Sequence, residues 1–214
     1  MSRILCQQCY RPKVTCICAF VSKVANTMPV IVLQHPNEVG QSKGSLTLLA
    51  NSLNHCTVIV GEDFSENTQL NLLLANYREH AYLLYPHEQA ITLQKPKAIN
   101  HITKQQSLTI NNQTQHDNAC LILIDATWKK AYRMFMLSNN LQQLIKLQLP
   151  QGYQSHYLIR KTSVTNGLST LEACCYALGL IEQDESKYLS LIDKFKEFNH
   201  FLLSFRQKIN SNNG

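Results

Sequence analysis

The chain lacks any apolar run long enough to cross a bilayer, and its first residues, MSRILCQQCY, lack the apolar centre of a signal peptide. These two absences argue against a membrane protein and against a secreted one, so we expect a cytoplasmic location. Because the cytosol keeps thiols reduced, the eight cysteines are expected to be free thiols or metal ligands rather than a disulfide framework.

Acidic residues are scarce in two parts of the 214-residue chain. No Asp or Glu precedes Glu38, whereas four Lys or Arg residues do. Between residues 89 and 171, nine cations accompany only two acids. The net charge of +6 is modest, but both basic regions would suit a polyanion. A basic surface without any partner is the alternative that composition leaves open.

Apolar runs alternate with stretches of helical periodicity along most of the chain, which predicts an α/β domain with a mostly parallel sheet. The polar segment 96–118 has little periodicity and is expected to be a surface excursion. We expect strands at 29–34, 57–60, 81–86, 120–125 and near 155–160. Helices are expected at 42–54, at 67–80, from Thr127 onward, and in two closing segments, the last at about 185–208. A short element of undetermined type is expected near 141–146.

Four cysteines crowd the stretch CQQCYRPKVTCIC, as two close pairs within thirteen residues. Their number and type suit a closed tetrahedral zinc site, and Cys16 and Cys18 are too close in sequence to form an unstrained disulfide. An iron–sulfur cluster and unligated thiols are the alternatives. We therefore predict a zinc knuckle over residues 1–25 with the ligands Cys6, Cys9, Cys16 and Cys18, and a catalytic domain over 26–214. The cysteines inside apolar patterns are expected to be core residues: Cys56, Cys120, Cys174 and Cys175.

The stretch CLILIDATWKKAYRM places Asp125 where a strand ends and a helix begins. Open α/β sheets bind ligands there, although Asp is also a good helix N-cap, and both interpretations stand. Trp128 begins an apolar helical face, so it is either a core aromatic or part of a site. Lys129 and Arg133 are four residues apart with Lys130 beside them, and an anion such as a phosphate backbone would relieve their repulsion.

Two other stretches carry polar residues at expected element ends. LQHPNE places His35 and Glu38 directly after the first strand, where a turn with an incidental His is an equal possibility. Further along, Arg160 and Lys161 precede GLSTLEA, in which Ser169 and Glu172 match a capping box. A helix N-terminus beside a glycine also suits a carboxylate or phosphate.

Taken together, CQQCYRPKVTCIC, QHPNE, DATW followed by KKAYRM, and GLSTLEA resemble the DTW-domain family in order and spacing. The resemblance runs from Cys6 to about Leu180. Relatives often carry Gly where this chain has Ala126, a change of one small residue for another. The family contains the tRNA-uridine aminocarboxypropyltransferases.

The resemblance implies a SPOUT-like fold, an α/β sheet with helices on both faces and a C-terminal part knotted around S-adenosylmethionine. It also implies transfer of the 3-amino-3-carboxypropyl group of S-adenosylmethionine to the ring imide nitrogen of a tRNA uridine, in the variable loop for the bacterial branch. Methylthioadenosine is released. The implied partners are therefore tRNA and S-adenosylmethionine, while the sequence leaves the oligomeric state undetermined.

Chemistry then assigns roles to the matching residues. Asp125 would accept the imide proton, and Thr127 with Gly167, Leu168 and Ser169 would hold the cofactor. Trp128 or Tyr132 would stack on the uridine. The expected substrate-binding residues are His35, Glu38, Trp128, Lys129, Lys130, Arg133, Arg160 and Lys161, with the cations holding phosphates.

Three other functions remain compatible with these residues. A SPOUT-type methyltransferase would move the methyl group of the same cofactor. A non-catalytic zinc-dependent module would bind RNA without turnover. A ribosomal-RNA aminocarboxypropyltransferase would differ only in its substrate.

Overall fold

A six-stranded sheet lies at the centre of the molecule, and all of its strand pairs are parallel. The computed structural model describes residues 4–41, 44–95, 119–155 and 167–211, with no side chains described beyond residue 204. The strand order is β2-β1-β5-β3-β6-β4. The strands are β1 (Val30–Gln34), β2 (Cys56–Val60), β3 (Ala81–Leu84), β4 (Ile91–Thr92), β5 (Cys120–Asp125) and β6 (Ile145–Gln148).

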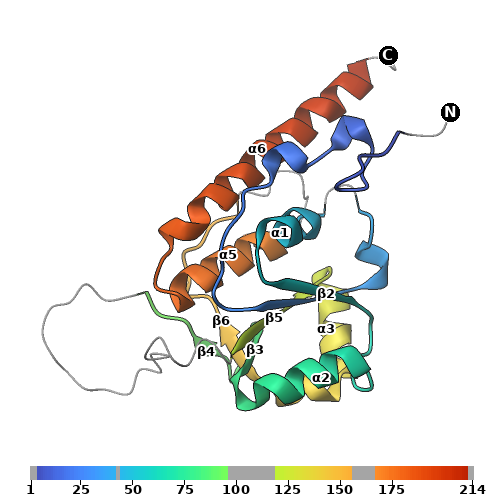
Figure 1. Cartoon of the computed structure of the whole chain (residues 1–214). Coiled ribbons are helices and arrows are strands. Elements are labelled where there is room, and N and C mark those ends of the chain that lie inside the picture. The colour runs from blue at the N-terminus through green and yellow to red at the C-terminus, as the bar shows by residue number, and fades with distance from the viewer. Residues whose placement is uncertain (1–3, 42–43, 96–118, 156–166, 212–214) are drawn as a thin grey trace, which may run out of the picture.

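Helices cover both faces of the sheet, as predicted (Figure 1). Alternate residues of β1 point to opposite faces, so Val30 and Val32 pack with α1, α5 and α6, whereas Ile31 and Leu33 pack with α2, α3 and α4. The α-helices are α1 (Leu46–Ser52), α2 (Thr68–Tyr77), α3 (Trp128–Leu137), α4 (Asn139–Gln143), α5 (Thr170–Ile181) and α6 (Ser186–Ser211). None of the helices in the described ranges is both long and apolar enough to span a membrane.

The N-terminal knuckle packs beside the C-terminal half of α6 (Figure 1). Its short 3-10 helices are η1 (Lys13–Thr15) and η2 (Cys18–Phe20), and the others are η3 (Pro36–Glu38) and η4 (Arg78–His80). Phe20 contacts the rings of Phe198 and Phe201, with centroids 5.5 and 5.4 Å away. Because Ile17 is fully buried in the same core cluster as α5 and α6, the knuckle is anchored to the sheet domain.

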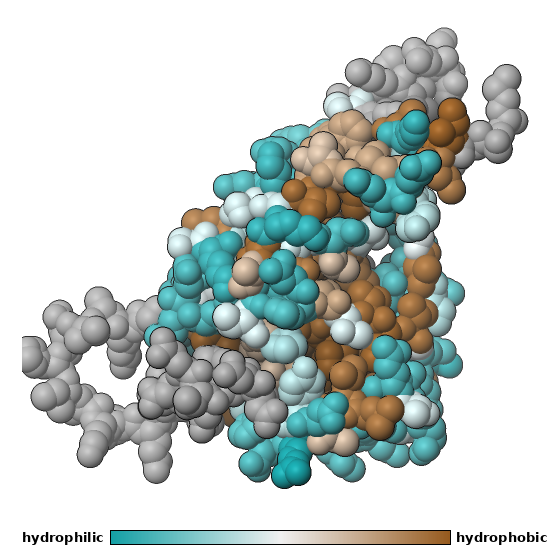
Figure 2. Space-filling view, in the orientation of Figure 1, coloured by the Kyte–Doolittle hydropathy of each residue, from teal (hydrophilic) through white to brown (hydrophobic). Residues whose placement is uncertain are grey.

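Hydrophilic residues cover much of α6 on the face shown in Figure 2, whereas hydrophobic residues gather below it, around β2. This surface agrees with β2 being an edge strand, since Val58 and Val60 are partly exposed.

Several predicted boundaries need correction. The helix expected at 42–54 covers only Leu46–Ser52 of the described residues. The element expected near 141–146 is the end of α4 followed by β6, and β4 was not predicted. The expected excursion at 96–118 lies outside the described residues, as does all but the first residue of the strand expected near 155–160.

Candidate active site and metal centre

The four knuckle cysteines converge on one point. Their sulfur atoms all lie within 4.8 Å of one another, and the Sγ atoms of Cys6 and Cys18, and of Cys9 and Cys16, are each 3.7 Å apart. A tetrahedron with Zn–S bonds of about 2.3 Å has edges of about 3.8 Å. The sulfur spacing therefore fits a tetrahedral metal ion, while every cysteine in the described residues is a free thiol.

Backbone N–H groups favour the thiolate form of one cysteine in this cluster. The N–H groups of Cys9 and Gln8 point at the Cys6 sulfur and lower the pKa of that thiol to about 6. In contrast, burial and the neighbouring thiols raise the pKa of Cys18 to about 12. A bound divalent ion would remove the repulsion among four thiolates, and the donor set is the one that structural zinc prefers.

We predict one zinc ion per chain on these four sulfurs. Replacing Cys9→Ser together with Cys16→Ser should reduce the zinc content of purified protein from about one ion per chain to none, because two ligands of a closed four-ligand site are lost. Elemental analysis checks this result. Cys56→Ser, outside the cluster, should keep its zinc, and a double variant with unchanged zinc would refute the site.

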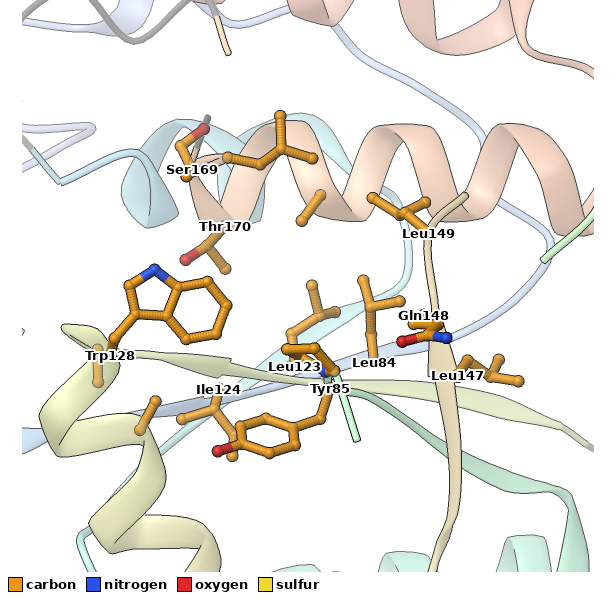
Figure 3. A pocket seen from close by; sticks show the side chains of 16 residues that line it. Leu84, Tyr85, Leu123, Ile124, Trp128, Leu147, Gln148, Leu149, Ser169 and Thr170 are labelled. Carbon is orange, nitrogen blue, oxygen red and sulfur yellow. The ribbon is translucent and has the colours of Figure 1, made fainter. Parts of the chain in front are cut away.

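A pocket of about 310 Å³ opens where β3, β5 and β6 end and α5 begins (Figure 3). In an open parallel sheet, this edge is where ligands bind. Figure 3 shows Ser169 and Thr170 above the pocket, Trp128 at one end, and Gln148 with Leu149 at the other. The lining residues are mostly apolar: Leu84, Tyr85, Pro86, Leu123, Ile124, Ala126, Trp128, Ala131, Leu147, Gln148, Leu149, Gly167, Leu168, Ser169, Thr170 and Ala173.

Asp125 ends β5 beside this pocket, with its carboxylate held from two sides. The Thr170 hydroxyl donates to Oδ1 at 2.6 Å, and the Gln34 side-chain amide donates to Oδ2 at 3.0 Å. Thr170 itself lines the pocket, so it links the carboxylate to the cavity wall. Asp125 is not the N-cap of α3, because Thr127 occupies that position. The capping alternative for Asp125 is therefore wrong, and its side chain is oriented by tertiary contacts.

Trp128 is not a core aromatic. Its side chain is 48% exposed and lies at the pocket mouth, facing Thr170 (Figure 3). Tyr132, one turn further along α3, is 60% exposed. The buried face of α3 consists instead of Ala131, Met134 and Phe135. An exposed indole at the edge of an apolar pocket is suited to stacking on a planar ligand.

The cations of α3 are partly neutralised within the protein. Lys130 Nζ lies 2.8 Å from Glu38 Oε1, and Arg133 Nε lies 2.8 Å from Glu62 Oε1. Glu62 therefore supplies an anion beside Arg133, so the repulsion between Lys129 and Arg133 does not by itself require an external one, and phosphate binding by these cations stays a prediction. Lys129 is exposed at the surface.

His35 lies beside Glu62, the acid that pairs with Arg133. Its side chain is buried, with Nδ1 accepting from the Asn37 N–H at 3.1 Å and Nε2 lying 3.5 Å from Glu62 Oε1. His35 and Glu38 therefore belong to the turn after β1. Glu38 and Glu62, the acid beside His35, both pair with cations of α3. The structure brings His35, Glu38, Lys130 and Arg133 together, while Arg160 and Lys161 lie outside the described residues.

The predicted capping box at the start of α5 is confirmed. Glu172 N–H donates to Ser169 Oγ at 3.2 Å, and Ser169 N–H donates to Glu172 Oε2 at 2.8 Å. Gly167, Leu168 and Ser169 all line the pocket. Because the Ser169 N–H is already paired, a bound carboxylate would have to use other donors. Thr127 does not line the pocket.

Sequence reasoning missed Gln34, Glu62 and Thr170. Glu62 follows β2 as Asp125 ends β5, so the rule that ligands gather at the carboxyl ends of parallel strands would have found it. Gln34 ends β1 and pairs in register with Asp125, so the same rule would have found it. Thr170 carries no comparable signal, because it meets Asp125 across 45 residues of sequence.

The parallel sheet, the pocket at the carboxyl ends of its strands and the cysteine cluster are the features of an α/β protein with a candidate ligand site and a knuckle that could hold a metal ion. The model of the DTW domain matches residues 3–203, and the chain belongs to this family.

Relatives of known name match most of the chain. It is 30% identical over 184 residues to tRNA-uridine aminocarboxypropyltransferase 2 of Mus musculus, an alignment covering 84% of this chain and 57% of that protein. It is 26% identical over 219 residues to tRNA-uridine aminocarboxypropyltransferase A of Arabidopsis thaliana, covering 92% and 81%. The chain thus spans just over half the length of the mouse protein. No solved structure matches it.

Proposed function

We propose that this chain is a tRNA-uridine aminocarboxypropyltransferase that uses S-adenosylmethionine as donor. The observation that carries the proposal is the Asp125 carboxylate, which lies behind the pocket lining and accepts a hydrogen bond from Thr170, a residue of the pocket wall that faces Trp128. The names of the relatives, tRNA-uridine aminocarboxypropyltransferases, support the same transfer reaction. The proposed location is cytoplasmic, where tRNA is available.

The pocket suits the donor in size and polarity. Its volume of about 310 Å³ falls within the range of small-molecule sites, and its lining is mostly aliphatic. Apolar walls such as Leu84, Leu123 and Leu149 would hold the adenosine and methylthio parts, while Gly167 and Leu168 approach from the start of α5. The proposed SPOUT-like relationship, including a knotted C-terminal part, rests on the family resemblance, and the pocket lies where that fold would place its cofactor, at the carboxyl ends of parallel strands.

The reaction then follows from the residues around the pocket. An imide N–H is neutral near pH 7 and a weak nucleophile, so a positioned carboxylate that accepts its proton accelerates attack. Asp125 would take the proton while the imide nitrogen bonds to the methylene next to the sulfonium. The carbon–sulfur bond breaks with its electron pair moving to sulfur, which leaves neutral methylthioadenosine.

Trp128 would receive the uridine base. A uridine within folded RNA must be unstacked before its imide edge is accessible, and an exposed aromatic ring compensates for the lost stacking. Since Trp128 is 48% exposed and faces Thr170, a base stacked on it would lie next to Asp125. Orientation of the nitrogen in line with the methylene would supply much of the rate enhancement.

The donor's fate distinguishes this reaction from methyl transfer. When the protein turns over with tRNA, chromatography should find methylthioadenosine. Release of S-adenosylhomocysteine instead would identify a methyltransferase on the same fold. Zinc is proposed to be structural, because the cysteine cluster lies in the knuckle, against α6, and contributes no residue to the pocket lining.

Phosphate contacts by α3 give a second prediction. Lys129→Ala with Arg133→Ala should weaken tRNA binding severalfold and make the slope of log K against log salt shallower by up to about 2, because each lost phosphate contact reduces the slope by roughly 1. Filter binding over a salt series measures both quantities. Lys194→Ala, which removes an exposed α6 charge paired with Glu197, serves as the matched control. Unchanged binding of the double variant at every salt concentration would show that this face carries no RNA.

A further inference from the structure

The knuckle presents an aromatic side chain that contributes little to its folding. Tyr10 lies between the ligands Cys9 and Cys16, and 78% of it is exposed. Its N–H donates to the Cys6 carbonyl at 2.9 Å, which closes the turn through the backbone alone. The ring is therefore not needed to hold the turn.

The backbone at Tyr10 also disfavours a bulky residue. Its φ of 55° lies in the left-handed region, which glycine and asparagine adopt readily and large side chains rarely do. A tyrosine in this conformation is a local cost to stability, with no compensating burial of the ring. Strain of this kind, held in place by the surrounding ligands, is often found at functional positions.

The surroundings of Tyr10 favour RNA as the partner. Residues 1–37 contain four Lys or Arg and no Asp or Glu. A Zn²⁺ ion on four thiolates carries a charge of about −2, so this segment keeps a net charge of about +2. Of its cations, Arg11 is buried over the Phe198 ring, whereas Lys13 is exposed. Lys13 lies on the other arm of the same turn, and Ile4, whose carbonyl accepts from the Lys13 N–H, is 71% exposed.

We propose that Tyr10 is a stacking site for an unpaired base of the RNA substrate, separate from the uridine pocket, with Lys13 contacting the adjoining phosphate. Zinc knuckles and single-stranded RNA modules use exposed aromatic rings in this way, because every base offers a planar face. Because the knuckle packs beside α6 and contributes no residue to the pocket lining, the contacted nucleotide would be other than the modified uridine (Figure 1). This inference rests on the proposed function, which supplies the RNA.

Tyr10→Asn in zinc-loaded, full-length protein tests the inference. Asparagine tolerates the left-handed backbone, so the zinc content should stay the same and the melting temperature should hold or rise. The Kd for unmodified tRNA should nevertheless increase by about tenfold, the loss expected for one stacked base. Tyr10→Phe, which keeps the ring, should bind like wild type, and Val14→Asn, an exposed change in the same knuckle, serves as the matched control.

Wild-type tRNA affinity in Tyr10→Asn would overturn the inference, as would equal losses in Tyr10→Asn and Val14→Asn. The result is independent of the transfer reaction. If no aminocarboxypropyl product forms but Tyr10→Asn binds tRNA tenfold more weakly than wild type, the proposed function fails while the stacking site stands. If product forms and Tyr10→Asn binds normally, only the stacking site fails.

Discussion

Asp125→Asn is expected to lower turnover by about two orders of magnitude or more, the usual effect of losing a general base. Asparagine keeps the size of the side chain but removes its charge and basicity. The surrounding contacts can adapt, because Thr170 can still donate to the remaining oxygen and the Gln34 amide can turn its own oxygen toward the new NH₂ group. The melting temperature and S-adenosylmethionine binding should therefore remain near wild type.

The pH dependence gives this variant a second readout. Raising the pH should partly restore turnover, because hydroxide can deprotonate the imide when no carboxylate is present to do so. Single-turnover rates over a pH series, together with thermal melts, separate the two roles of Asp125. A variant with normal turnover and reduced stability would mean that Asp125 is only a structural hydrogen-bond acceptor.

Ala173→Phe is expected to weaken S-adenosylmethionine binding by roughly a hundredfold or more, about 2.7 kcal/mol. Ala173 lines the pocket from the first turn of α5, so a phenyl ring there would occupy a large share of the roughly 310 Å³ available. Titration calorimetry measures the loss directly. Since a ligand that binds only the folded state raises the melting temperature, the cofactor should stabilise wild type but not this variant.

Two variants control for effects unrelated to the pocket. Ala173→Ser keeps the side chain small at the same position and should bind the cofactor nearly normally. Ala75→Phe makes the same chemical change at an exposed position of α2 and should leave affinity unchanged. Unaltered affinity in Ala173→Phe would place the cofactor elsewhere. Because tRNA is proposed to contact α3 and the knuckle, Ala173→Phe should still bind it.

The central strands could be predicted because burial on both faces requires continuous apolar residues. β1 and β5 are such runs, and they were placed to within one residue. β4 was missed because Ile91 and Thr92 alone give no periodicity. β6 was not separated from the short element expected near 141–146, because it has only four residues and one of them, Lys146, is a buried cation with its ammonium on the Gln142 carbonyl and over the Phe135 ring.

Some features of the site can be predicted from the local sequence, whereas others are formed only by the fold. Asp125 and Trp128 could be located because a strand-to-helix junction is visible in the sequence. The particular contacts around them could not be predicted, because each joins segments distant in the chain. These contacts are Asp125 with Gln34, Asp125 with Thr170, and Glu62 with Arg133. Charge counting alone suggested free cations on α3, while the fold pairs Lys130 and Arg133 with acids.

The central claim is that this chain transfers an aminocarboxypropyl group to a tRNA uridine. Its most direct test is to incubate the zinc-loaded protein with S-adenosylmethionine and unmodified tRNA, digest the tRNA, and determine the mass of each nucleoside. The account predicts a uridine heavier by one 3-amino-3-carboxypropyl group, carried on its ring nitrogen, and no such product with Asp125→Asn at matched times. A methylated uridine, or tRNA that remains unmodified while binding to the protein normally, would contradict it.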